Sequence, residues 1–325
     1  MTTSPSAPPA AGDPATLGFA SALGAFLIWG LAAPVYFKQL TGVATVEIVA
    51  HRVLWTVLLV GALVLATTGT AGIRRVLDCR RRLGALLLTT LLISLNWSLF
   101  TWAMTHDRLI ESSLGYYINP IVNVVLGVVF LHERLSRRQL GAVLLAGAGV
   151  GSLVLSYGAV PWLALALALS FGFYALVRKK AAIDPVVGLL VETALMMPAA
   201  LLYLLWLVHS GAGAFGAQGP GTDLLLVMAG PVTAVPLLLF TVAASRLKLS
   251  TLGLMQYIGP TGQLLLGVLV YGEAFTAGHA LAFGCIWLAL ALYSADAVSA
   301  HRAARAAGGP AQRDGAPDAV RKMEA

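Results

Sequence analysis

Long apolar runs separated by short polar segments extend along nearly the whole chain. A helix needs about 20 apolar residues to cross the hydrocarbon of a bilayer. Ten stretches of that kind occur, near residues 17–37, 46–67, 83–104, 110–131, 138–156, 160–178, 186–208, 224–243, 250–271 and 276–296. The runs are continuous, as in GALLLTTLLISL, and lack the alternation that membrane β-strands show. The pattern predicts an all-α integral membrane protein with ten transmembrane helices.

The composition supports the same class. Of the 325 residues 58% are hydrophobic and only 11% are charged, against about 25% charged residues in soluble domains. The mean hydropathy is +0.84, and a soluble fold would need a polar surface that such a chain cannot supply. The only cysteines, Cys79 and Cys285, are far apart in sequence, which favours neither a disulfide framework nor a metal site. We therefore expect no metal and no cofactor.

The distribution of basic residues predicts the orientation. If both termini lie on one side of the membrane, 18 of the 21 Lys and Arg residues fall on that side, in or directly beside loops 68–82, 132–137, 179–185 and 244–249 and in the tails. The other side holds only Lys38 and Arg108, and Arg52 lies within a span. By the positive-inside rule both termini are cytoplasmic. The net charge of +7 then reflects topology, so we expect no nucleic-acid partner and contact with the lipid bilayer instead.

The second half of the chain repeats the first. The segments YINPIVNVVLGVVFLHE (117–133) and YIGPTGQLLLGVLVYGE (257–273) share seven identities in seventeen positions at an offset of 140, and the first spans of the two halves agree at an offset of 142. Each half holds five spans, so the second copy must cross the membrane in the opposite sense. The Arg-rich loop 68–82 corresponds to loop 209–223, which has no Lys or Arg. Inverted repeats of this kind are typical of secondary transporters.

Two prolines fall within matching spans, at Pro120 and Pro260. A proline inside a helix removes a backbone hydrogen bond and kinks or interrupts the helix. Either these are packed kinks, or the two helices line the transport pathway. In the second interpretation the polar side chains beside the breaks face the substrate: Tyr116, Tyr117, Asn119, Gln256 and Tyr257.

The stretch TVEIVAHRVLWTVLL (45–59) places ionisable side chains at the start of a span. On a helix Glu47, His51 and Trp55 share one stripe, and Arg52 points about 100° away from His51. Three interpretations stay open. Glu47 and Arg52 reach the lipid headgroups, or they form ion pairs with another helix. Alternatively they line an aqueous vestibule, where Glu47 or His51 exchanges protons and Arg52 meets an anionic group of the substrate.

Further polar residues lie deeper in the predicted spans. Glu192 has no basic residue beside it in sequence, so it must be neutral or paired with another helix. We interpret it as a proton or substrate-amine site at the central cavity, with Asn96 and Trp97 as further wall residues. Glu133 and Glu273 end their spans at the interface and are expected to cap or pair neighbouring helix ends.

The fragments AHRVLW, NWSLFTWA, SLGYYINPIVNVVLGVVFLHERL, LALALSFGFYALVRKKA, STLGLMQYIGP and IWLALALYSAD resemble the RarD branch of the EamA group, in the drug/metabolite transporter superfamily. The likeness covers about residues 17–296. It implies a ten-helix inverted-repeat carrier in a bacterial inner membrane. The implied domains are a disordered tail over 1–16, EamA-like repeats over 17–156 and 157–297, and a disordered cytoplasmic tail over 298–325.

The expected function is alternating-access transport of a small metabolite or drug-like molecule, with proton coupling and a homodimer left open. Two other classes are weighed against it. One is a membrane-embedded transferase that uses Glu47, His51 and Glu192, and the other is a passive channel. HER at 132–134 lacks the second His of the zinc-protease pattern, and the chain has no GK pair for a P-loop. We therefore expect no catalytic residues.

Overall fold

The structure is a computed structural model that describes residues 14–67, 69–132, 137–157, 160–181, 183–244, 246–247 and 255–307. These parts of the chain are helical and contain no strand. The elements are α1 (Pro14–Leu27), η1 (Ile28–Ala32), α2 (Ala33–Lys38), α3 (Thr45–Thr67), α4 (Ala71–Leu77), α5 (Arg80–Thr105), α6 (Leu109–Leu131), α7 (Arg137–Tyr157), α8 (Trp162–Ala181), α9 (Pro185–Ser210), α10 (Pro220–Ala244), α12 (Ile258–Leu265), η2 (Leu266–Val270) and α13 (Ala277–Ala307). The η elements are single π-helical segments.

Within the described residues, seven helices are long and apolar enough to cross a membrane. They are Thr16–Lys38, Thr45–Thr67, Arg80–Thr105, Leu109–Phe130, Trp162–Ala181, Pro185–Ser210 and Pro220–Ala244. Each coincides with one of the ten predicted spans, which confirms a multi-pass helical membrane protein. The predicted spans near 138–156, 250–271 and 276–296 contain α7, α12 with η2, and α13, which do not meet those criteria. The full set of ten spans therefore stays a prediction.

Helix ends follow local sequence signals. Asp184 precedes α9, and its Oδ1 accepts hydrogen bonds from the Val186 and Val187 N–H groups at 3.0 Å each. Gly211 ends α9 at a φ of +66°, a conformation that costs glycine little. The predicted capping role of Glu273 is confirmed, as described below, whereas Glu133 lies outside the described residues. α13 continues to Ala307 beyond the predicted end of the second repeat, because SAHRAARAA is rich in strong helix formers.

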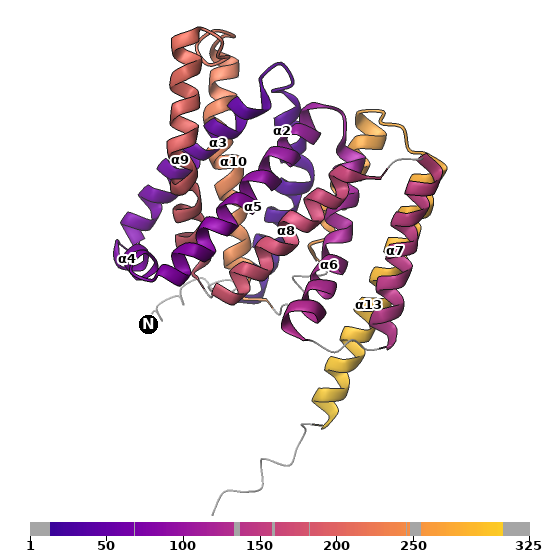
Figure 1. Cartoon of the computed structure of the whole chain (residues 1–325). Coiled ribbons are helices and arrows are strands. Elements are labelled where there is room, and N and C mark those ends of the chain that lie inside the picture. Colours follow the sequence, from indigo (N-terminus) through magenta and orange to yellow (C-terminus); the bar gives the residue numbers. More distant parts are fainter. Residues whose placement is uncertain are drawn as a thin grey trace, which may run out of the picture.

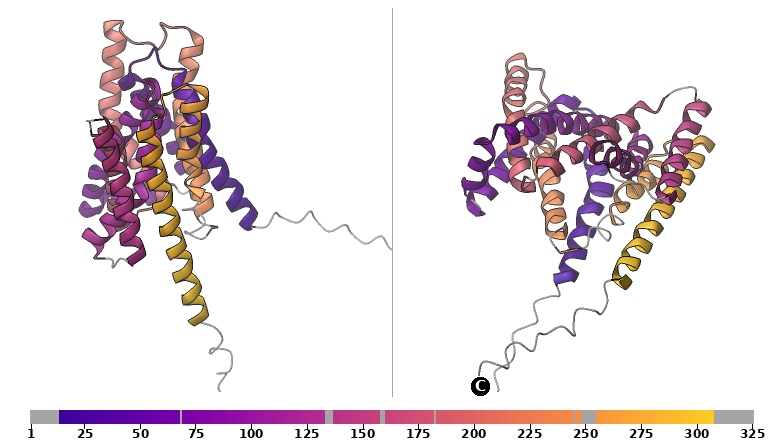
Figure 2. Two further views of the ribbon diagram at one scale, coloured as in Figure 1. Left: turned by 90° about the vertical axis from the view of Figure 1, so that its right-hand side faces the viewer. Right: turned by 60° about the horizontal axis from the view of Figure 1, so that its bottom comes forward.

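The pairing of helices brings the two halves of the chain together. α7 lies along α13, α6 along α8 and α12, and α3 along α9 and α10, while α5 contacts α8 and α9 and α1 contacts α10. Figure 1 shows the α7–α13 pair at one side of the bundle and the α9–α10 pair at the other. Figure 2 shows the beginning of α1 and the end of α13 at the same end of the molecule.

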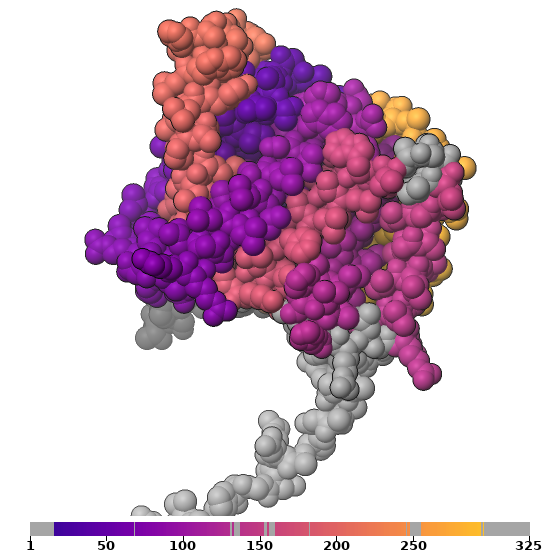
Figure 3. All heavy atoms as spheres, viewed as in Figure 1, coloured from indigo at the N-terminus to yellow at the C-terminus, as the bar shows by residue number. Residues whose placement is uncertain are grey.

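The Arg-rich connection that contains α4 and the connection without Lys or Arg between α9 and α10 lie at different ends of the bundle. α4 lies at the end of the bundle where α1 begins, whereas the link between α9 and α10 lies at the opposite end (Figure 1). Residues 69–82 and 209–223 therefore lie at opposite ends, which is the arrangement that the inverted repeat predicts. α9 and the start of α10 rise beyond their neighbours there (Figure 3). Their outer surfaces carry exposed apolar side chains, which suits contact with lipid; these include Leu202, Leu205, Trp206, Val208 and Leu224.

Candidate functional site

Glu47 fixes the link between α9 and α10 to the start of α3. Its side chain is 2% exposed, and Oε1 accepts hydrogen bonds from the N–H groups of Ala214 at 2.8 Å and Phe215 at 3.1 Å. Amide donors of this kind stabilise a buried carboxylate. In the described conformation Glu47 therefore contacts the backbone, and it does not reach the surface as headgroup contact would require.

His51 lies one turn further along α3. Its Nδ1 accepts a hydrogen bond from Trp55 Nε1 at 3.3 Å, so the predicted stripe of His51 and Trp55 is confirmed. The imidazole stacks on Phe215, with ring centroids 5.0 Å apart. Nε2 is buried and has no hydrogen-bond partner within the described structure. Because Nδ1 accepts a hydrogen bond, Nε2 carries the proton of the neutral ring and is a buried donor available to a ligand.

Arg52 is a buried cation held between aromatic rings. Its side chain is 7% exposed, and its guanidinium carbon lies 4.1 Å from the centre of the Trp97 ring and 5.5 Å from that of Phe37. Nε donates to Thr233 Oγ1 on α10 at 2.7 Å. NH1 has no hydrogen-bond partner within the described structure. α2, α3, α5 and α10 therefore meet around one positive charge.

The two asparagines predicted at the pathway contact α8. Asn96 Nδ2 donates to the Leu167 carbonyl, and Asn119 Nδ2 donates to the Ala168 carbonyl, each at 3.1 Å. The Tyr116 hydroxyl donates to Asn96 Oδ1 at 3.4 Å. Asn96 and Asn119 are 2% and 1% exposed. Their present contacts hold α5 and α6 against α8.

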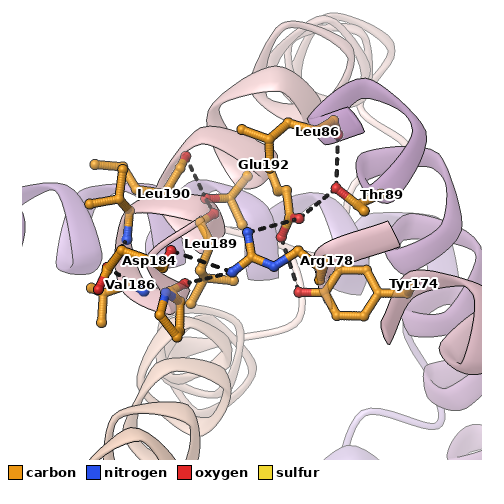
Figure 4. Close-up of polar contacts among 12 residues, drawn as sticks. Leu86, Thr89, Tyr174, Arg178, Asp184, Val186, Leu189, Leu190 and Glu192 are labelled. Atoms are coloured by element: carbon orange, nitrogen blue, oxygen red, sulfur yellow. Dashed lines mark hydrogen bonds and ion pairs between the residues drawn. The ribbon is translucent and has the colours of Figure 1, made fainter. Parts of the chain in front are cut away.

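Glu192 is completely buried and has three polar partners from neighbouring helices (Figure 4). Thr89 Oγ1 on α5 donates to Oε1 at 2.6 Å, and the Tyr174 hydroxyl on α8 donates to Oε2 at 3.2 Å. Arg178, near the end of α8, places NH1 3.5 Å from Oε1. Glu192 therefore has a cationic partner from another helix, which is one of the two alternatives that the sequence left open, although the sequence did not show which helix supplies it.

Gly188 makes this ion pair sterically possible. A Cβ built on Gly188 would lie 1.6 Å from Arg178 NH1 and 2.4 Å from its Cζ. Gly188 is one turn before Glu192 on α9, so the missing side chain leaves the space through which Arg178 reaches the carboxylate. The ion pair therefore depends on the glycine at position 188 as well as on the two charged side chains.

Tyr117 and Tyr257, which are equivalent in the repeat, lie face to face. Their ring centroids are 6.1 Å apart with an interplanar angle of 13°. The Tyr117 hydroxyl also hydrogen-bonds Thr261 Oγ1. These three side chains, with Trp287 and Leu290, line a cavity of about 310 Å³.

The two prolines differ in their surroundings. Pro120 lies inside α6, which continues from Leu109 to Leu131 without interruption. Pro260 lies in the first turn of α12, where its missing N–H costs little. Gln256 and Tyr257 form the turn before it, and both are half-buried. A break therefore occurs at the second position only.

A larger cavity of about 530 Å³ lies between α6, the start of α8 and the segment after η2. Glu273 on its wall accepts hydrogen bonds from the Leu109 N–H at 2.7 Å and the Ile110 N–H at 2.9 Å, and so caps α6. Among the residues that the structure describes, no group of three or more His, Cys, Asp and Glu residues is placed to hold a metal ion.

Sequence reasoning missed several partners of these sites. Arg178 was assigned only to topology, although its position beside the apolar run SFGFYALV could have suggested an inward contact. Thr89, Thr233 and Phe37 carry no sequence signal, since threonine and phenylalanine are ordinary residues of a membrane helix.

Comparisons with known proteins agree with this architecture. Residues 16–155 match the profile of the EamA-like transporter family. An "Uncharacterized transporter" of Vibrio cholerae is 47% identical over 89% of this chain and 96% of its own length. The protein RarD of Escherichia coli is 44% identical over 88% of this chain and 96% of its own length. A crystal structure with 20% identity aligns with a TM-score of 0.53 over 86% of this chain and 97% of that chain, which supports the fold alone. The chain is a membrane transporter of the EamA family and belongs to its RarD type.

Proposed function

We propose that the protein is a secondary transporter that moves a small metabolite or drug-like molecule across the bacterial inner membrane by alternating access. In this proposal residues 17–156 and 157–297 form inverted five-helix repeats, and both termini are cytoplasmic. The observation that carries the proposal is that contacts in one half have counterparts in the other at the offsets of the sequence repeat.

Two pairs of contacts illustrate this equivalence. A Cβ on Gly262 would lie 2.9 Å from the Gly30 carbonyl oxygen, and a Cβ on Gly172 would lie 2.7 Å from Val122. In the sequence repeat Gly30 corresponds to Gly172 at an offset of 142, and Gly262 corresponds to Val122 at an offset of 140. The two contacts are therefore equivalent. The same offsets convert the Asn119–Ala168 contact into Gly259 and Phe26, where a Cβ on Gly259 would lie 4.0 Å from the Phe26 carbonyl oxygen.

The ion pair of Arg178 and Glu192 supplies an element that can open and close. It joins α8, α9 and α5 near the end of the bundle that holds α4, which is the cytoplasmic end on the predicted topology. Separation of these helices towards the cytoplasm would have to break the pair. We therefore propose that the pair closes the cytoplasmic side while the other side is accessible, as alternating access requires.

The first experiment is counterflow in liposomes. The purified protein is reconstituted, and radiolabelled metabolites identified by comparing the contents and medium of cells with and without the protein are offered to preloaded vesicles. Saturable counterflow is expected. Chemical turnover without movement would favour the transferase alternative with Glu47, His51 and Glu192, and flux that neither saturates nor counterflows would favour a channel.

The second experiment tests orientation. After replacement of Cys79 and Cys285, single cysteines are placed in loop 68–82 or loop 209–223 and labelled in intact cells with a membrane-impermeant maleimide. Only the second site is expected to react before the cells are opened. Labelling of both from the same side would exclude the inverted repeat.

Proton coupling is a separate part of the proposal, supported by the buried Glu192 carboxylate and the buried His51 imidazole, both of which can take up a proton. Transport is compared across an imposed pH gradient in wild type, Glu192→Gln and His51→Ala. At least one variant is expected to lose its dependence on the gradient. Equal dependence in all three would remove both residues from coupling.

A further inference from the structure

The surroundings of Arg52 leave its positive charge without a negative partner. The ion pairs among the described residues are Lys38–Asp107, Arg108–Glu111 and Arg178–Glu192, and none includes Arg52. The nearest acid on the same helix, Glu47, accepts hydrogen bonds from the Ala214 and Phe215 amides instead.

An uncompensated guanidinium at this depth is costly. Removing a charged group from water is costly unless another charge or enough hydrogen bonds replace the solvent. The contacts with Trp97 and Phe37 offset part of this cost, and among the described residues Arg52 has one hydrogen-bond acceptor, the neutral hydroxyl of Thr233. An apolar side chain would join the same helices without that cost. The arginine is therefore poorly explained as a packing residue.

The side chains around Arg52 are mostly aromatic, which limits the kind of molecule that fits beside it. Trp97 and Phe37 cover the guanidinium, Phe100 packs edge-on against Phe37 at 5.9 Å, and Tyr116 packs against Phe100 at 6.0 Å. The phenol groups of Tyr116 and Tyr36 also lie within electrostatic range of Arg52. A flat, largely apolar molecule suits such a wall better than a strongly hydrated ion does.

Two further buried hydroxyl groups on the same two helices have no hydrogen-bond partner among the described residues. Thr56 is one turn from Arg52 on α3, and Thr101 is one turn from Trp97 on α5. Their hydroxyl oxygens and Arg52 NH1 are all buried without a hydrogen-bond partner in the described structure. Buried polar groups are normally satisfied, so three such groups along two facing helices indicate a place that a polar ligand completes.

From these observations we propose that Arg52 binds the carboxylate of the transported molecule, and that this substrate is an aromatic or otherwise apolar monocarboxylate. Arg52 NH1 donates to the carboxylate, the rings of Phe37, Trp97 and Tyr116 contact the apolar body, and a single cation selects one negative charge. This inference rests on the proposed transport function and adds the substrate class to it.

The test measures equilibrium binding to the purified full-length protein in detergent. The probe is radiolabelled 3-phenylpropionate, displaced by unlabelled aliphatic and aromatic monocarboxylates and by the amide of each acid. We expect the acids to bind at least about tenfold more tightly than their amides, as loss of a charge-assisted hydrogen bond predicts. Equal binding of acids and amides, or no saturable binding of any acid in the set, would overturn the proposal without reference to a variant.

Variants then assign the preference to one side chain. Arg52→Gln is expected to weaken acid binding at least about tenfold and to abolish the preference over amides. Arg52→Lys should keep the preference with weaker binding, because it keeps the charge and loses the planar fork. The matched control is Arg74→Gln on the exposed surface of α4, which should bind as wild type does. A preserved preference in Arg52→Gln contradicts the proposal.

The outcome separates the two levels of inference. Binding does not require movement across a membrane, so acid-selective binding without counterflow would leave the anion site standing and remove the carrier. Counterflow of a neutral substrate without acid-selective binding would support the carrier and remove the anion site.

Discussion

At the scale of residues, the buried ionisable groups have three kinds of surroundings. Glu47 accepts backbone amides, Glu192 has a cation and two hydroxyl donors, and Arg52 has aromatic faces but no described carboxylate partner. The first two carboxylates are thus supplied with partners within the protein. Arg52 differs because its charge is not balanced there, and for that reason it is the strongest candidate for substrate contact.

Glu192→Gln should destabilise the protein by about 3 kcal/mol, because it leaves the Arg178 cation largely buried without its anion. Adding Arg178→Gln should recover most of this loss, since the second change removes the unpaired charge. Thermal unfolding of the single and double variants in detergent measures the coupling. Effects that simply add would show that the two side chains do not interact.

Gly188→Ala should separate the same pair without changing either charge, because the new Cβ occupies the position of the Arg178 guanidinium. We expect a loss of stability similar in direction to that of Glu192→Gln. Gly84→Ala on α5 is the matched control, because a Cβ there would meet nothing within 4 Å. That control should be neutral or stabilising by up to about 1 kcal/mol. Equal behaviour of the two glycine variants would refute the steric role of Gly188.

At the scale of elements, the ends of helices join the two halves of the chain. Glu273, from the second half, caps α6 in the first half, and Glu47, from the first half, binds the link between α9 and α10 in the second. Each carboxylate replaces two of the backbone partners that a helix end or a tight loop lacks. These contacts couple elements that are more than 160 residues apart in sequence.

Glu273→Gln should loosen the start of α6, because it removes the negative charge and one of the two equivalent acceptors at the helix N-terminus. The expected cost is about 1 kcal/mol. Hydrogen exchange should become faster at the amides of Leu109 and Ile110, as measured by mass spectrometry of the peptide that contains them. Glu111→Gln, in the first turn of the same helix, is the control that keeps both cap bonds. Unchanged exchange in Glu273→Gln would contradict the capping role.

The sequence predicted the elements better than their partners. Seven apolar runs became long membrane helices within a few residues of the expected bounds, because the length of a span is set by bilayer thickness. The capping role of Glu273 followed from its place at a span end. The partner of Glu192 did not, since Arg178 approaches from another helix through a space left by Gly188. Contacts of this kind depend on tertiary packing, which periodicity does not specify.

At the scale of the whole molecule, alternating access requires that one end opens while the other is closed. At the end that holds α4, the Arg178–Glu192 pair joins α8 to α9, and α4 contacts α9. A Cβ on Gly72 of α4 would lie 3.1 Å from Val187 Cγ2 of α9. The two positions are therefore in direct contact, so a disulfide between them can be tested.

Gly72→Cys with Val187→Cys, in a background without Cys79 and Cys285, should therefore lock this end when oxidised. Counterflow is expected to stop on oxidation and to return with a reductant, because the helices can no longer separate. Each single cysteine variant should transport under both conditions. Full transport by the cross-linked protein would show that this end does not open between α4 and α9.

The face-to-face contact of Tyr117 and Tyr257 has a consequence for the movement itself. If the two repeats exchange conformations during the cycle, the rotation that interchanges them carries this pair of rings onto itself. The contact is then present whichever way the carrier faces, and its geometry should be the same in both end states. A spectroscopic probe placed there would report no change while probes at either mouth report large ones, which makes this pair a natural internal reference for following the motion.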